Sequence, residues 1–203
     1  MPEITWPDDL RPESVEWSPA VLPEMVSTSV FNQSTQGQVL GAAYYVVKVS
    51  IGARRRSEVP AWEAFIARFA DSANRVRFWD WRWESPRGAA AGTPLVMGAG
   101  QTGAAIVTDG WVPNTSGVLL PGDYVGLSGQ LRRVVAPANS NGAGQATLTL
   151  DQPVRSPPAD NAPVVLSKPT SLFICTTDKR ARGFVQEGAR HHGPVLEFME
   201  VFA

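Results

Sequence analysis

Hydrophobic and polar residues follow their most regular pattern just after residue 57. Four large apolar residues are spaced there as on one face of a helix: Trp62, Phe65, Ile66 and Phe69. Ser57 precedes them as a candidate N-cap, and Pro60 falls in the first turn, where its missing N–H costs no hydrogen bond. The pattern predicts an amphipathic helix over about residues 59–70 whose apolar face packs against a sheet.

A turn and an aromatic strand are predicted directly after this helix. Asp71 and Ser72 interrupt the helical pattern, and residues 76–83 then alternate as a strand does. Three tryptophans fall on one side of that strand: Trp79, Trp81 and Trp83. Since the strand leads toward a segment of different composition at residue 88, we expect these tryptophans at the contact between two modules.

Shorter alternating segments predict further strands near both ends of the chain, over residues 25–31, 41–51, 172–176, 184–186 and 195–202. In the last of them Leu196, Phe198 and Phe202 share one face. Residues 1–24, by contrast, are rich in proline and acidic residues, and we expect them to be irregular.

The composition changes between residues 88 and 168, where charged residues become rare and glycine, alanine, valine, threonine and proline dominate. Short strands separated by turn signals are predicted there, over residues 95–98, 104–108, 124–127, 131–135, 146–150 and 164–166. We expect this segment to be a small inserted β-barrel of the OB or SH3-like kind. Residues 1–87 and 169–203 then form a mainly β domain, a β-sandwich with one amphipathic helix, that carries the insertion.

The charge of the chain argues against one class of function. With 203 residues, a formal net charge of −1 and a pI near 6.1, the protein lacks the basic excess of a dedicated nucleic-acid binder. The single cysteine, Cys175, lies in an apolar segment and is expected to be buried. No secretory signal and no apolar run of bilayer length are visible, so we expect a protein made in the cytoplasm with no membrane insertion.

Residues that could carry chemistry are few, and each has a structural explanation. His191 and His192 are adjacent, which is not the spacing of a helical metal site. Asp71, Asp80 and Glu84 could supply the carboxylate pair of a hydrolase acting on cell-wall sugar, but cross-strand ion pairing explains Asp80, which Arg77 and Arg82 flank, more simply. We therefore expect a protein that is not an enzyme, with no catalytic residue, no metal and no cofactor.

Aromatic and basic residues point instead to assembly. Trp6 and Trp17 in the N-terminal segment either pack back on the domain or reach a neighbouring subunit, since tryptophan is enriched at interfaces. The run Arg54, Arg55 and Arg56 is either a solvated face or a contact for acidic groups of a partner. These five residues form the candidate interface.

An alternative function also rests on aromatic residues. Because aromatic faces bind sugars, the inserted segment could be a carbohydrate-binding module that recognises surface glycans of a host through Trp111 and Tyr124. Tryptophans in sheets serve packing and subunit contacts more often than carbohydrate binding, so assembly is the favoured interpretation.

Several segments together resemble one protein family. They are residues 60–69 (PAWEAFIARF), 83–88 (WESPRG), 96–103 (VMGAGQTG), 108–111 (TDGW), 120–125 (LPGDYV) and 196–200 (LEFME). From about Val26 onward, the chain resembles the distal tail proteins of long-tailed, siphovirus-type bacteriophages and of related prophage-derived particles.

The resemblance implies a structural virion protein, assembled in the cytoplasm of a host bacterium and located at the tail tip. It implies a ring of identical subunits, typically a hexamer, that connects the tail tube protein to the baseplate hub protein. The inserted module would project outward, where tail fibres or the tape-measure protein are further candidate partners. DNA passes through such a ring without specific recognition.

Overall fold

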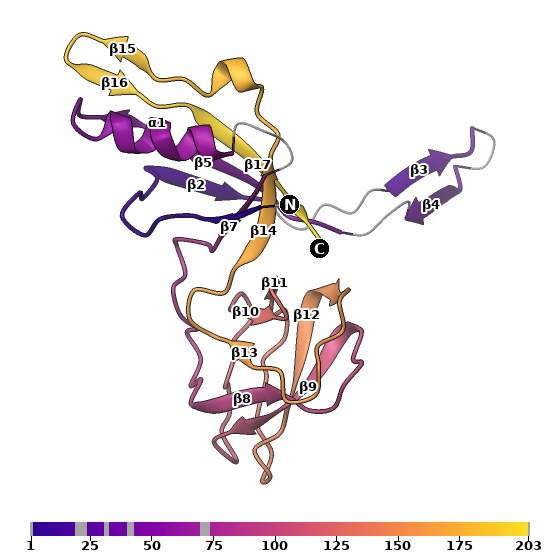
Figure 1. Ribbon diagram of the computed structural model, residues 1–203. Coiled ribbons are helices and arrows are strands. Elements are labelled where there is room, and N and C mark those ends of the chain that lie inside the picture. The colour runs from indigo at the N-terminus through magenta and orange to yellow at the C-terminus, as the bar shows by residue number, and fades with distance from the viewer. Residues whose placement is uncertain (1, 19–23, 31–32, 40–42, 70–73, 203) are drawn as a thin grey trace.

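The computed structural model describes residues 2–18, 24–30, 33–39, 43–69 and 74–202, and Figure 1 shows their arrangement. The protein is mainly β, with 44% of residues in strands and 7% in helical conformation, as predicted. Asp71 and Ser72, the predicted turn after the helix, lie outside the described residues.

A six-stranded sheet forms the centre of the main domain. Its strands lie in the order β1 (Glu3–Thr5), β7 (Arg75–Phe78), β14 (Ser171–Cys175), β17 (Val195–Val201), β5 (Val46–Ser50) and β2 (Ser14–Trp17). The two central strands, β14 and β17, therefore come from the end of the chain. Cys175 is 8% exposed at the end of β14, so the prediction that it is buried is confirmed.

The proline and acidic content of the N-terminal segment predicted an irregular structure, and this prediction is wrong. The segment supplies both edge strands of this sheet. Glu3 pairs in parallel with Arg75, and Ser14 pairs antiparallel with Ser50. An isolated strand gains no backbone hydrogen bonds, so local composition gave no sign of a pairing that depends on strands far along the chain.

The predicted helix is present as α1 (Val59–Arg68) and packs its apolar face against the sheet. The predicted residues Trp62, Phe65 and Ile66 are buried, as is Phe69 at the C-cap, and Val59 in the first turn is buried as well. The N-cap is Glu58 and not the predicted Ser57, and its side chain makes no capping hydrogen bond.

The predicted aromatic strand is shorter than expected, because β7 ends at Phe78. Asp80 turns the chain: its carboxylate accepts a hydrogen bond from the Arg82 backbone N–H, and its carbonyl accepts one from Trp83 N–H at 2.9 Å. Such side-chain bonds to the following backbone favour a turn over a strand. The three tryptophans after Phe78 thus do not share one face of a strand.

Residues 88–168 form a second β unit, in which two three-stranded sheets face each other (Figure 1). The first contains β11 (Gln130–Arg133), β10 (Tyr124–Leu127) and β13 (Val164–Val165); the second contains β12 (Ala146–Val154), β9 (Gly103–Trp111) and β8 (Gly92–Val96).

The expected barrel is not closed. The two sheets meet only through isolated bridges, Leu95 with Pro163 and Val134 with Leu150. At the first of these seams Pro94 and Pro163 have no backbone N–H to donate, so a continuous ladder cannot form there.

The described residues form two hydrophobic cores. One lies between the main sheet and α1, and the other lies inside the inserted unit, from Val96 to Val164. Two residues of the inserted unit, Tyr124 and Leu131, pack into the first core. The two units are therefore joined by an apolar contact as well as by the two points at which the chain passes from one unit to the other.

The described residues also form a small sheet, a 3-10 helix and a separate hairpin. A three-stranded sheet contains β15 (Val185–Glu187), β16 (Arg190–His192) and β6 (Ala53–Arg54), and a short 3-10 helix, η1 (Lys179–Ala181), precedes it. The hairpin β3 (Glu24–Thr28) and β4 (Thr35–Val39) stands away from the main sheet in Figure 1.

Candidate functional site

The junction between the main sheet and the inserted unit contains the densest polar network in the described part of the protein. The chain crosses this junction twice, near Glu84 and near Lys168. The Lys168 backbone N–H donates to the Glu84 carbonyl at 2.8 Å, and its ammonium group lies 3.3 Å from the Asp8 carboxylate. The two crossings are thus tied to each other and to the N-terminal segment.

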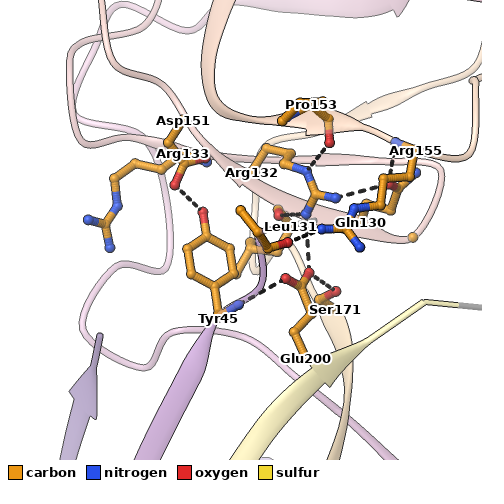
Figure 2. A network of polar contacts seen from close by, with 12 residues as sticks. Tyr45, Gln130, Leu131, Arg132, Arg133, Asp151, Pro153, Arg155, Ser171 and Glu200 are labelled. Carbon is orange, nitrogen blue, oxygen red and sulfur yellow. Dashed lines mark hydrogen bonds and ion pairs between the residues drawn. The ribbon is translucent and has the colours of Figure 1, made fainter. Parts of the chain in front are cut away.

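A buried ion pair joins the two units directly (Figure 2). Arg132 on β11 and Glu200 on β17 approach to 3.1 Å, and both side chains are 0% exposed. Removing two charges from water costs more than their attraction returns unless their remaining donors and acceptors are also satisfied. This condition can be checked atom by atom.

The network satisfies both charged groups. The Glu200 carboxylate accepts further hydrogen bonds from the Ser171 hydroxyl at 2.7 Å and the Tyr45 backbone N–H at 3.2 Å. The Arg132 guanidinium donates to the Gln130 side-chain oxygen at 3.0 Å and to the Pro153 carbonyl at 3.3 Å. Each of these partners belongs to the same unit as the charged group that it contacts, so the contact between the units is the ion pair itself.

The electrostatics of the network reflect its burial. Burial raises the pKa of the Glu200 carboxyl, while Arg132 and the Ser171 and Tyr45 donors act in the opposite direction. Burial, together with the nearby Arg132, lowers the pKa of Arg155, whose guanidinium lies 3.6 Å from the centre of the Phe202 ring.

A second polar contact crosses the junction beside the ion pair. The Tyr45 hydroxyl donates to the Asp151 carboxylate at 2.5 Å, and the other Asp151 oxygen accepts from the Arg133 backbone N–H at 3.0 Å (Figure 2). Burial raises the pKa of Tyr45 well above its ordinary value of 10.0, and the neighbouring Asp151 raises it further. Tyr45 is therefore held as a neutral donor.

Tyr45→Phe is expected to lower the free energy of unfolding by about 0.5–1.5 kcal/mol at pH 7, the usual value of one hydrogen bond. A folded pKa above the unfolded value of 10.0 means that the contribution of Tyr45 is complete below pH 10 and is lost as the pH rises beyond it. The difference in free energy of unfolding between the wild type and the variant, measured by urea unfolding, should be smaller above pH 10 than at pH 7. A difference in free energy of unfolding that does not change with pH would contradict this explanation.

The predicted inter-module tryptophans are only partly at the junction. The Trp79 ring is 5.3 Å from the Lys168 ammonium at one crossing, and the Trp83 ring is 5.6 Å from the Arg87 guanidinium at the other. Trp81 instead stacks on Phe78 in the first core, at 5.2 Å.

The candidate interface residues fall into a buried group and a surface group. Trp6 and Trp17 are 5% and 7% exposed in the first core, so they pack back on the domain and are not on a surface open to a neighbouring subunit. Their spacing along a proline-rich segment did not show that both flanking strands join the main sheet. Arg54, Arg55 and Arg56 remain at the surface, where they line a hollow outside the junction.

The residues considered for hydrolysis and metal binding are placed in structural roles. Asp80 is 2% exposed and pairs with Arg82 at 2.7 Å, but the contact is local to the turn and not between strands as expected. Glu84 is exposed at the chain crossing, and Asp71 lies outside the described residues. His191 and His192 belong to β16 and not to a loop, and the described residues hold no group of three side chains suited to a metal ion.

The aromatic residues considered for carbohydrate binding are buried. Trp111 is 3% exposed and donates its ring N–H to the Thr108 hydroxyl at 2.8 Å, while Tyr124 is 4% exposed. Neither offers a free ring face on which a sugar could stack.

Sequence reasoning missed the central ion pair, although one signal was present. Leu196, Phe198 and Phe202 were placed on the inward face of the last strand, and the two-residue period puts Glu200 on that same face. A carboxylate on a core face requires a buried partner. The identity of that partner, Arg132, depends on how the inserted unit docks and could not be read from local sequence.

Within the described residues, no helix has the length and apolar character that crossing a bilayer requires. Neither a protein-family model nor a curated protein matches the chain.

Proposed function

We propose that the protein is a structural subunit of a phage tail tip, which assembles into a ring between the tail tube and the hub. The observation that carries this proposal is the satisfied ion pair between Arg132 and Glu200, which fixes the inserted unit on the main sheet. A subunit that connects two parts of an assembly must hold its own two units in a constant orientation. The family resemblance supplies the kind of assembly.

The β3–β4 hairpin supports the proposal independently. Met25 and Val26 are 56% and 58% exposed on β3, and Val30 after it is 95% exposed. Apolar side chains gathered on an element that stands off the body are typical of a surface that another chain covers. The hairpin is therefore a candidate contact within the ring or with the tail tube.

The carbohydrate-binding alternative loses the residues on which it rested, since Trp111 and Tyr124 are buried in the single chain. We therefore propose one function only.

The test is assembly with tail components. The full chain, alone and mixed with the tail tube and hub proteins of the same particle, is expected to form rings visible by electron microscopy and of a defined mass in solution. Met25→Ser combined with Val26→Ser should reduce ring formation, because it removes exposed apolar area from the hairpin. The matched control is Val195→Ser, an equally exposed valine on β17. A chain that stays monomeric under all these conditions would refute the proposal.

A further inference from the structure

Four arginines gather in one surface hollow. Strand β6 carries Arg54 and pairs with β16, which begins at Arg190, while Arg55 and Arg56 lead from β6 into α1. The hollow has a volume of about 320 Å³ and is lined by Ala53, Arg54, Arg55, Arg56, Glu58, Ala189 and Arg190. The three-arginine run is thus completed by a fourth arginine from a distant part of the chain.

The four arginines of this hollow outnumber the one carboxylate that lines it, so the hollow keeps a net positive charge. In the part of the chain that the structure describes, none of its four arginines forms an ion pair. Elsewhere arginines do find carboxylates: Arg82 pairs with Asp80, and Arg87 pairs with Asp123. Glu58 also lines the hollow and offsets one of the four positive charges, and its carboxylate accepts the Arg55 backbone N–H at 2.8 Å.

The fold holds one of these arginines in place. The Arg54 guanidinium donates to the Arg11 carbonyl at 2.7 Å and lies 5.4 Å from the centre of the Trp62 ring. Like charges held close together repel one another, and an anion bound between them would relieve that repulsion. A guanidinium also presents its donors in a fork that matches a carboxylate.

We propose that the hollow formed by Arg54, Arg55, Arg56 and Arg190 is a docking site for carboxylates of a second copy of this chain. The net charge of the chain is −1, so the rest of the molecule carries negative charge that outweighs the four arginines. A second copy offers exposed carboxylates, including Asp9 and Glu16 of the N-terminal segment. A basic patch that meets a different, acidic patch is a head-to-tail contact, which is the kind that closes a ring.

This inference rests on the proposed function, because it names one of the contacts of the ring. It also assigns to the surface a residue, Arg190, that the sequence pattern did not connect with the arginine run.

The test reverses charge in the hollow of the full-length chain. Arg55→Glu combined with Arg190→Glu is expected to weaken self-association about tenfold or more, measured by sedimentation at low salt, because like charges then face each other across the contact. Arg55→Lys combined with Arg190→Lys should retain part of the association, since the charge remains but the fork is lost. Raising the salt concentration should weaken the wild type and leave the reversed variant little changed.

A control variant separates this effect from general charge. Lys179→Glu combined with Arg180→Glu makes the same change in net charge on η1, outside the hollow, and should associate like the wild type. Circular dichroism and urea unfolding establish that each variant is folded. Arg55→Gln combined with Arg190→Gln provides a second double variant, which removes the two charges without reversing them.

The outcomes separate this inference from the proposed function. Rings that form equally well from the reversed variant would overturn the docking site and leave the proposed function standing. A wild-type chain that forms no assembly, alone or with tail proteins, would overturn both. A short DNA duplex that binds the wild type and not the reversed variant, with self-association unchanged, would show that the occupant is a nucleic acid and overturn the second copy as the ligand.

Discussion

Arg132→Met is expected to lower the free energy of unfolding by about 3–5 kcal/mol at pH 7, because it leaves the Glu200 carboxylate buried without its cation. Both side chains are 0% exposed and 3.1 Å apart, so the carboxylate left behind is shielded from bulk solvent. Urea unfolding followed by tryptophan fluorescence measures the change. A loss below about 1 kcal/mol would mean that the junction opens to solvent in the native state.

The pH dependence of this variant provides a further check. Burial already raises the pKa of Glu200 above its ordinary value of 4.5, and removing Arg132 removes an interaction that opposes this rise. A raised folded pKa means that the neutral carboxyl is tolerated below pH 4.5 and that stability falls as the pH rises through the folded pKa. The deficit of Arg132→Met should therefore be smaller at pH 4 than at pH 7.

The matched control is the double variant Arg132→Met with Glu200→Gln. Glutamine carries no charge, keeps one oxygen that can accept from the Tyr45 N–H, and places its NH2 group beside the Ser171 hydroxyl, which can accept from it. We expect the double variant to be more stable than Arg132→Met alone, since replacing both charges of a buried pair is often close to neutral. If the two substitutions simply added, the two groups would not interact as the structure indicates.

Phe78→Ala is expected to have a comparable effect, about 3–5 kcal/mol, because it leaves a cavity in the middle of the first core. Phe78 is 1% exposed and lies face to face with Phe173 at 4.1 Å, and its ring also contacts Phe198 at 5.2 Å. From β7 its ring also meets the Trp6 ring of the N-terminal segment, 5.6 Å away. The same urea titration measures the loss.

Two controls bracket this prediction. Phe78→Leu keeps most of the apolar volume and should cost clearly less than the alanine variant. Val195→Ala changes a valine that is 54% exposed on β17 and should stay within about 0.5 kcal/mol of the wild type. Equal losses for Phe78→Ala and Val195→Ala would contradict a packed aromatic centre.

Local periodicity predicted the parts of the fold that depend on local burial. The helix was predicted correctly because Trp62, Phe65 and Ile66 recur at the helical spacing on a face that the sheet covers. Most strands of residues 88–168 were also placed correctly, since turn residues mark their ends; β10 is an example. The helix N-cap was misplaced by one residue, and Glu58 has no side-chain cap to mark it.

Errors arose where distant contacts decide the structure. The N-terminal segment forms strands because β7 and β5 offer free edges, which composition cannot show. Alternation of Trp79, Trp81 and Trp83 predicted a strand, but the side chain of Asp80 forms local bonds that turn the chain. The barrel was expected from strand number alone, whereas closure requires backbone donors that Pro163 lacks at the seam.

The candidate site was least accessible to sequence reasoning, since its members are far apart along the chain. The Arg132 and Glu200 side chains are separated by 68 positions, and neither has a local motif. Arg54, Arg55 and Arg56 were noticed as a run, but Arg190 joins them only through the pairing of β6 with β16.

The strand order of the main sheet has a consequence for synthesis on the ribosome. The pairs β1–β7 and β2–β5 come from the first 78 residues, but β14 and β17, which lie between them, begin only at Ser171 and Val195. The inserted unit contains all its own strands and can fold before the two central strands of the main sheet have been synthesised. A nascent chain, or one truncated before residue 171, therefore exposes unpaired strand edges, and we expect such fragments to be prone to aggregate or to depend on chaperones until the last strands emerge.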